Sequence, residues 1–246
     1  ALRNIADPPI LLYVMGELPQ EKYAVAVVGS RDCSMYGMRA ATYFSQELAQ
    51  RGIPIISGGA RGIDSIAHEA ALNVGGKTVA VLGCGIDVVY PEENGALFQR
   101  IAQNGAVITE FPPGTKPLAF NFPARNRIVV GLAQGVLVTE AGRKSGALIT
   151  GHLAADEGRE VYCIPGDIFQ GKSIGCHDLI RKGAKLVDSL ADILEDKENW
   201  QEMQKLKQAN ARSIFDFQIS EEEQKAYEQQ QKAARKKSAE EKAARE

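Results

Sequence analysis

Short runs of consecutive apolar residues recur along the chain, and the segments between them show helical spacing of apolar residues. The six runs lie at residues 24–28, 53–57, 78–83, 106–110, 135–140 and 160–165. Unbroken Val, Ile and Leu runs are typical of strands buried on both faces, as in a parallel sheet. Helical spacing is clearest at residues 39–50, 63–74 and 96–101, and Gly follows several of these segments. The pattern therefore predicts an α/β fold with a doubly wound, mostly parallel, Rossmann-like sheet.

The same pattern divides the chain into three zones. Residues 1–20 hold three prolines and an apolar patch and are expected to form a connector or an edge strand. Residues 21–194 contain nearly all of the Gly and β-branched residues and are expected to form the Rossmann-like domain. Residues 195–246 contain no Gly or Pro and form a charged, helical C-terminal tail in this interpretation. The tail is expected to be helical near its start and loose after Ala209.

Composition narrows the class of protein. The chain has 246 residues, of which 44% are hydrophobic and 24% charged, so it can bury a sizeable core without disulfides or metals. Its 29 basic and 31 acidic residues nearly balance, so any nucleic-acid site must be a local concentration of charge. No apolar run approaches the roughly 18 residues of a membrane span. The four cysteines form no CxxC pair, and we expect a reduced, cytoplasmic protein without membrane, metal or cofactor.

Basic and small residues gather in four of the loops that follow the predicted strands. Ligands of open α/β sheets bind at the carboxyl ends of the strands, so these loops are expected to share one edge. Gly and Ser allow backbone N–H groups to approach an anion, and Arg can hold phosphate. The sequence thus predicts an anion-binding rim, although the glycines alone could serve turns and the arginines caps or ion pairs. The rim loops are residues 29–31, 57–64, 112–127 and 140–146, and they contain Arg31, Arg61, Lys116, Arg125, Arg127, Arg143 and Lys144.

Nucleotide-binding motifs are weak. GxGxxG is absent, and Ser57 ends the second run where a dinucleotide fold needs an acidic residue, which disfavours a dehydrogenase. Residues 166–173 match the P-loop pattern GxxxxGK[ST] formally. A working P-loop continues directly into a helix, whereas helical spacing here begins only near His177. We therefore expect this match to be a coincidence, with an ATPase that uses residues 166–173 as an alternative.

Catalytic constellations are sparse. The histidines His68, His152 and His177 lie far apart in the sequence, and no metal or catalytic residue is predicted. The carboxylates of Asp64 and Glu140 lie on the rim and could serve a hydrolase. We favour helix capping and pairing with rim arginines for both. The chain is accordingly not expected to be an enzyme.

Six segments, taken together and in order, resemble the DNA-processing protein A family (DprA/Smf). They are VVGSR (27–31), SGGARGID (57–64), FPARNRIV (122–129), VTEAGRKSGALIT (138–150), IPGD (164–167) and DLIRKGA (178–184). The resemblance spans about Pro8 to Leu194. It implies an extended Rossmann domain that binds single-stranded DNA, usually as a homodimer. It also implies that the protein shields incoming DNA and loads the RecA recombinase during natural transformation.

The resemblance also assigns roles to residues. It implies that Arg31 and Lys116 contact DNA and makes Phe120 a candidate for base stacking. Phe122 is expected to belong to the core, whereas core and stacking roles stay open for Phe120. The helical N-terminal and winged-helix C-terminal domains of many members are expected to be missing. Combining the rim and the resemblance, the predicted DNA-binding residues are Gly29, Ser30, Arg31, Gly58, Gly59, Arg61, Lys116, Phe120, Arg125, Asn126, Arg127, Lys144, Ser145 and Gly146.

A nucleotide phosphoribohydrolase of the lysine-decarboxylase-like type is the main alternative from another class. Its fold is similar, and its signature is PGGxGTxxE. The corresponding loop here, EAGRKSGALIT, lacks both the paired Gly and the later Glu. Release of free base from a nucleoside monophosphate would decide for this enzyme.

Overall fold

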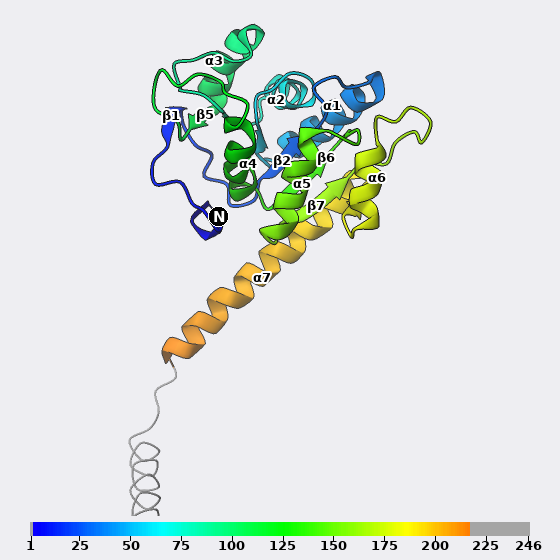
Figure 1. Cartoon of the computed structure of the whole chain (residues 1–246). Coiled ribbons are helices and arrows are strands. Elements are labelled where there is room, and N and C mark those ends of the chain that lie inside the picture. Colours follow the sequence, from blue (N-terminus) through cyan, green and yellow to red (C-terminus); the bar gives the residue numbers. More distant parts are fainter. Residues whose placement is uncertain (1, 217–246) are drawn as a thin grey trace, which may run out of the picture. The chain divides into compact units, whose positions relative to one another are not determined.

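A computed structural model of the chain describes residues 2–216 and contains one eight-stranded sheet (Figure 1). The strand order is β1-β5-β4-β3-β2-β6-β7-β8, and every neighbouring pair is parallel except β1 with β5. Each of the six apolar runs contains or overlaps one of the strands β2–β7, which confirms the α/β, mostly parallel prediction. The strands are β1 (Tyr13–Gly16), β2 (Val25–Val28), β3 (Ile55–Ser57), β4 (Thr78–Val81), β5 (Gly105–Thr109), β6 (Gly135–Val138), β7 (Glu160–Cys163) and β8 (Lys185–Leu186).

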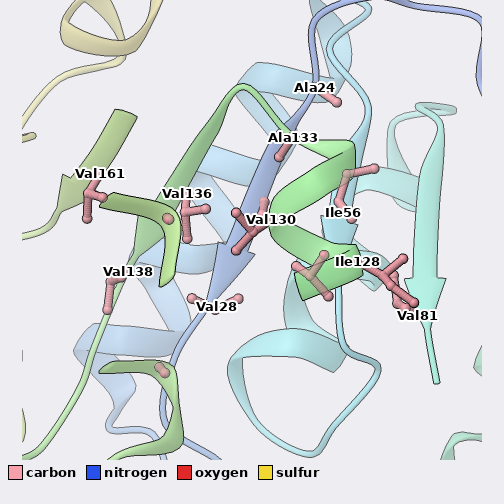
Figure 2. Close-up of a cluster of buried hydrophobic side chains, with 14 of the residues drawn as sticks. Ala24, Val28, Ile56, Val81, Ile128, Val130, Ala133, Val136, Val138 and Val161 are labelled. Atoms are coloured by element: carbon pink, nitrogen blue, oxygen red, sulfur yellow. The ribbon is translucent and has the colours of Figure 1, made fainter. Parts of the chain in front are cut away.

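Helices cover both faces of the sheet. Side chains alternate between the two faces of a strand, and β4 shows this directly. Val79 and Val81 pack with α4, whereas Ala80 packs with α3. Figure 2 shows the α4 side, where Ile128 and Val130 of α4 lie over the strands. The helices are α1 (Met35–Gln50), α2 (Ile63–Asn73), α3 (Gly95–Asn104), α4 (Asn121–Leu132), α5 (Gly146–Asp156), α6 (Ile174–Arg181) and α7 (Leu190–Asp216), with short 3-10 turns η1 (Leu2–Asn4) and η2 (Glu92–Asn94).

The order of the strands creates a switch point beside β2. From β2 the chain proceeds through β3 and β4 to β5 in one direction. It then returns through α4 to β6, on the other side of β2, and proceeds outward to β7 and β8. The loops that leave β2 and β6 therefore diverge, and ligands of doubly wound sheets bind in the crevice that such loops leave.

Two helix boundaries differ from the sequence predictions. Helix α6 begins at Ile174, directly after Ser173, and not near His177. Gly175 does not break this helix, because it lies against Leu148 and its N–H donates to the Ala141 carbonyl. The tail helix α7 continues past Ala209 to Asp216, so the prediction that the chain loosens after Ala209 is wrong for these residues. Ala211 and Arg212 are good helix formers, and residues 210–216 contain no Gly or Pro that would end the helix.

The chain separates into two compact units, Ala1–Glu195 and Asp196–Glu246. The tail beyond Asp216 lies outside the described residues. Within residues 2–216, no helix has both the length and the apolar character needed to cross a membrane.

Candidate nucleic-acid interface

A cavity of about 780 Å³ lies at the switch point. Three helices begin at its wall, namely α2, α4 and α5, and the N-terminal end of a helix carries partial positive charge that favours anions. The sequence folds in this way because each of these helices follows a strand at the carboxyl edge. The lining residues are Val28–Asp32, Gly58, Ala60, Asp64, Tyr90, Pro117, Ala119, Phe122, Pro123, Arg125, Asn126, Val129, Gly142–Ala147, Ile149 and Thr150.

The turn after β2 presents Arg31 to this cavity. The Ser30 N–H donates to the Glu140 carbonyl (2.8 Å), and the Ser30 carbonyl accepts from the Ile63 N–H (3.2 Å). A Cβ at Gly29 would lie 2.5 Å from the Ile63 side chain, so only Gly fits this close approach. Beyond the fixed turn, the exposed Arg31 guanidinium lies 5.4 Å from the centre of the Phe122 ring. This cation–π contact places Arg31 over an aromatic wall of the cavity.

The loop between β5 and α4 presents Lys116 and is held at several points. The Asp87 carboxylate accepts from the Gly114 N–H (2.8 and 3.0 Å). The buried Asn121 amide donates to the carbonyls of Gly83 (3.0 Å) and Lys116 (3.2 Å). Lys116 itself is exposed, and the neighbouring Pro117 lines the cavity. The ammonium group thus stands on a fixed loop at the cavity edge.

Two further cations precede α5. Arg143 and Lys144 are exposed, and the Ser145 hydroxyl caps α5 by accepting from the Ala147 N–H (3.3 Å). We call Arg31, Lys116, Arg143 and Lys144 the rim cations. Among the described residues, none of these four side chains forms an ion pair. Their charge is therefore available to an anion.

Two buried charged residues, Asp64 and Arg125, form the floor of the cavity. The Arg125 guanidinium donates to the carbonyls of Gly58 and Val81. Burial lowers the pKa of Arg125 to about 10, although the Asp64 charge opposes this change. Burial likewise raises the pKa of Asp64, and the Arg125 charge limits that rise. This arginine is therefore committed to the protein interior, with the guanidinium bonded to two carbonyls.

The second rim carboxylate, Glu140, holds the start of α1. It is buried and accepts from the N–H of Ser34 (2.9 Å) and from the Ser34 hydroxyl. Ser34 is the N-cap of α1. The contacts of both carboxylates are at helix starts, since Asp64 accepts from the Ala60 N–H (3.3 Å) just before α2. Among the described residues neither carboxylate forms an ion pair with a rim arginine, so the predicted pairing is not found.

Nine of the fourteen predicted binding residues line the cavity: Gly29, Ser30, Arg31, Gly58, Arg125, Asn126, Lys144, Ser145 and Gly146. Lys116 and Phe120 lie next to the lining residues Pro117 and Ala119. The other three lie outside the lining. Gly59 is buried beside Phe98, Arg61 forms a two-point ion pair with Glu93, and Arg127 pairs with both Glu110 and Asp7.

One of the two aromatic residues near the cavity, Phe122, differs from expectation. Phe122 is not a core residue: it is only partly buried, lines the cavity and lies 5.5 Å from the ring of Tyr90. Phe120 keeps 71% of its surface exposed, which decides against a core role. Tyr90 was not predicted, because it follows β4 in a segment without a recognisable motif. The sequence held one indication of its role, namely that this aromatic residue lies in a loop at the carboxyl edge of the sheet.

The P-loop match at residues 166–173 is followed directly by a helix. Because α6 begins right after Ser173, the expectation that no helix follows the match is wrong. However, the Lys172 ammonium donates to the Asp32 carboxylate (2.9 Å) and to the Asp32 carbonyl (2.7 Å). Asp167 and Glu140 also line a second cavity, of about 400 Å³, beside Lys172 and would repel a phosphate there. In the described part of the chain, no group of three His, Cys, Asp or Glu side chains could hold a metal ion.

The sequence matches the model of a known family over residues 1–198. That family is described as DNA recombination-mediator protein A. The chain belongs to this family. The match covers all of the rim loops and the whole of the sheet.

Relatives support this assignment. The chain is 50% identical to the DNA processing protein DprA of Streptococcus pneumoniae over 198 residues, which is 80% of this chain and 70% of that protein. It is 48% identical to the Smf protein of Escherichia coli over 192 residues, but spans only 51% of that protein. Activities of the longer relatives are therefore proposals for this chain.

Solved structures show the same fold. The S. pneumoniae DprA structure superposes with a TM-score of 0.74 at 49% identity, covering 79% of this chain and 69% of that one. A structure of Helicobacter pylori DNA processing protein A, described as revealing a single-stranded DNA binding mode, superposes with a TM-score of 0.74 at 31% identity. It covers 80% of this chain and 91% of that one. A molybdenum cofactor binding protein from Rippkaea orientalis, at 18% identity and a TM-score of 0.53, shares the fold alone.

Proposed function

We propose that the cavity and its rim bind single-stranded DNA. The observation that carries this proposal is the group of four rim cations, none of which forms an ion pair within the described part of the chain, at a cavity whose wall and edge carry aromatic rings. Non-specific binding of single strands needs a basic path for phosphates together with aromatic side chains for bases. The H. pylori relative binds single-stranded DNA, which supports the same ligand class here.

The geometry suggests how a strand is held. Arg31 and Lys116 stand on fixed turns and are the main phosphate contacts in this proposal, with Lys144, Ser145 and Gly146 at the start of α5. Phe120 offers an exposed ring for stacking, and the Phe122 and Tyr90 rings form an aromatic wall of the cavity. Arg125 is buried in the floor and donates to protein carbonyls, so we do not propose it as a phosphate contact. Arg61 and Arg127, already paired, have at most an accessory role.

The cellular role is also a proposal. We infer from the family that the protein shields incoming DNA and loads the RecA recombinase in the cytoplasm during natural transformation. We further propose that it acts as a homodimer. Light scattering at micromolar concentration is expected to give roughly twice the chain mass of 26.6 kDa, and a strictly monomeric mass would contradict the dimer.

Salt-dependent binding tests the DNA site. The affinity for a labelled single-stranded oligonucleotide is measured by fluorescence anisotropy at several salt concentrations. Each neutralised phosphate contributes about −0.7 to the slope of log affinity against log salt. Arg31→Ala and Lys116→Ala should each weaken binding and flatten the slope by about one contact. Duplex DNA should bind much more weakly, because its bases are not free to stack.

Two results would change the assignment. Unaltered affinity of the Arg31→Ala/Lys116→Ala double variant, with its fold intact by circular dichroism, would place the site elsewhere. Release of free base from a nucleoside monophosphate, or hydrolysis of ATP that Lys172→Ala abolishes, would favour one of the two enzyme alternatives.

A further inference from the structure

An acidic side chain stands inside the proposed DNA site. Asp32 follows Arg31 directly, lines the cavity, and its side chain is 98% exposed. A carboxylate at this place would repel the phosphates that Arg31 is proposed to hold. The cavity has one other acidic lining residue, Asp64, which is buried in the floor near the positive charge of Arg125. Without a partner, Asp32 would therefore weaken the binding of a phosphate at Arg31.

Lys172 supplies that partner from the other side of the switch point. Its ammonium group lies 2.9 Å from the Asp32 carboxylate and also donates to the Asp32 carbonyl at 2.7 Å. The second bond fixes the ammonium beside the backbone of the turn and so holds it near a side chain that would otherwise be free to move. The Asp32 N–H in turn donates to the Ser30 hydroxyl at 3.2 Å.

The loop that carries Lys172 is itself anchored. The Tyr36 hydroxyl in α1 donates to the Pro165 carbonyl. The His177 ring in α6 contacts the backbone of Gly166, with its Nε2 3.1 Å from the carbonyl oxygen. Ser173, next to Lys172, is buried. The loop that carries Lys172 is therefore held at both ends, and this keeps the ammonium group beside Asp32.

We propose that Lys172 is a positioning residue for the DNA site, which neutralises Asp32 so that Arg31 can hold a phosphate. This role rests on the proposed function. It also accounts for the P-loop match at residues 166–173: its lysine serves the neighbouring turn and not a nucleotide. Lys172 acts on DNA through Asp32 and makes no contact with the strand itself.

The test compares Lys172→Ala with Asp32→Asn/Lys172→Ala. Affinity for a labelled single-stranded oligothymidylate is measured by anisotropy at low and high salt. Lys172→Ala uncovers the carboxylate and should weaken binding about three- to fivefold at low salt, the effect of one charge a few ångströms from a phosphate in water. High salt should reduce this loss. Replacing Asp32 by Asn in the same variant removes the repulsion and should restore wild-type affinity.

Matched controls separate this role from a general structural one. Lys77→Ala breaks the Lys77–Glu21 ion pair, also 2.9 Å long, next to the start of β4 at the opposite edge of the sheet, and should leave affinity unchanged. Lys172→Arg keeps the charge and should keep the affinity. Thermal unfolding of each variant shows whether the fold is retained.

The outcomes distinguish this inference from the proposed function. If Lys172→Ala weakens binding but Asp32→Asn does not restore it, Lys172 contacts DNA directly or supports the fold, and the inference is overturned. It is also overturned if Arg31→Ala weakens binding while Lys172→Ala has no effect, a result that leaves the proposed function intact. If Arg31→Ala itself has no effect on affinity, the proposed DNA site is contradicted, and the inference that rests on it is contradicted as well.

Discussion

The rim and the floor of the cavity use the same residue type for opposite purposes. Arg31 on the rim is exposed, rests on an aromatic ring and has no ion-pair partner among the described residues. Arg125 in the floor is 4% exposed, bonded to two carbonyls and adjacent to Asp64. A buried charge must be compensated within the protein, whereas an exposed charge is free to bind. The comparison teaches that accessibility and pairing, more than residue type, separate binding cations from structural ones.

The largest expected effect is on stability, and it comes from replacing Arg125 in the floor of the cavity. Arg125→Met leaves the Asp64 carboxylate buried without its partner, and we expect a loss of about 3–5 kcal/mol in the free energy of unfolding. Urea denaturation followed by circular dichroism measures it. Adding Asp64→Asn should recover part of the loss, because the uncompensated charge is then gone. A variant of unchanged stability that binds DNA weakly would instead make Arg125 a binding residue.

The next effect concerns an aromatic residue at the cavity edge. Phe120→Ala should cost about 1–3 kcal/mol of single-stranded DNA affinity if the ring stacks on a base. The salt slope and the melting temperature should stay the same, because no charge and little buried surface are lost. Phe122→Ala is the matched comparison: since that ring is partly buried, it should lower the melting temperature as well. A lower melting temperature for Phe120→Ala, with unaltered affinity, would remove the stacking role.

The interior behind the floor should also differ from the rim in its response to pH. His68 is fully buried beside Thr78, with 2.6 Å between His68 Nδ1 and Thr78 Oγ1, and burial lowers the pKa of His68 to about 3. Because the Thr78 hydroxyl donates to the Ile55 carbonyl, it accepts from Nδ1–H, and Nε2 has no partner. The imidazole is thus neutral in the folded protein.

This neutral histidine predicts acid sensitivity. Between pH 6.5 and about 3 the unfolded chain binds a proton at His68 that the folded chain does not. The free energy of unfolding is therefore unaffected by His68 above pH 6.5. Below pH 6.5 it should fall by about 1.4 kcal/mol for each pH unit. His68→Asn keeps a donor towards Thr78 and should remove this part of the pH dependence. Equal slopes for both proteins, measured by urea denaturation between about pH 7 and 5, would contradict the assignment.

The smallest expected effect belongs to a cation that is exposed but paired. Arg61 lies in a rim loop, yet its guanidinium forms a two-point ion pair with Glu93, which lowers the pKa of Glu93 to about 2. Arg61→Ala should change DNA affinity less than about twofold, because neither Arg61 nor Glu93, whose carboxylate the change uncovers, lines the cavity. Arg31→Ala, measured in parallel, supplies the contrast. Equal losses for both variants would show that pairing does not separate binding cations from others.

The fold was predictable from the sequence to a large extent. Six apolar runs became the six central strands, because strands buried on both faces must be continuously apolar. The carboxyl-edge loops could also be identified, since a doubly wound sheet places them at one edge whatever their residues are. Arg31, Lys144 and the small residues beside them line the cavity for that reason. Order along the chain thus determined which segments meet at the candidate site.

Only the tertiary structure decided what each side chain does there. In the sequence, Arg61 and Arg127 look like Arg31, but each forms an ion pair with a carboxylate from another segment, Glu93 and Glu110 respectively. Arg125 is buried and donates to the carbonyls of Gly58 and Val81. Contacts between distant segments have no local signal in the sequence. The same holds for Lys172, whose partner Asp32 lies 140 positions away. The contact between the Phe122 and Tyr90 rings in the cavity wall is equally non-local. Local pattern fixes periodicity and burial on average, whereas charge pairing and accessibility depend on which segments the fold brings together.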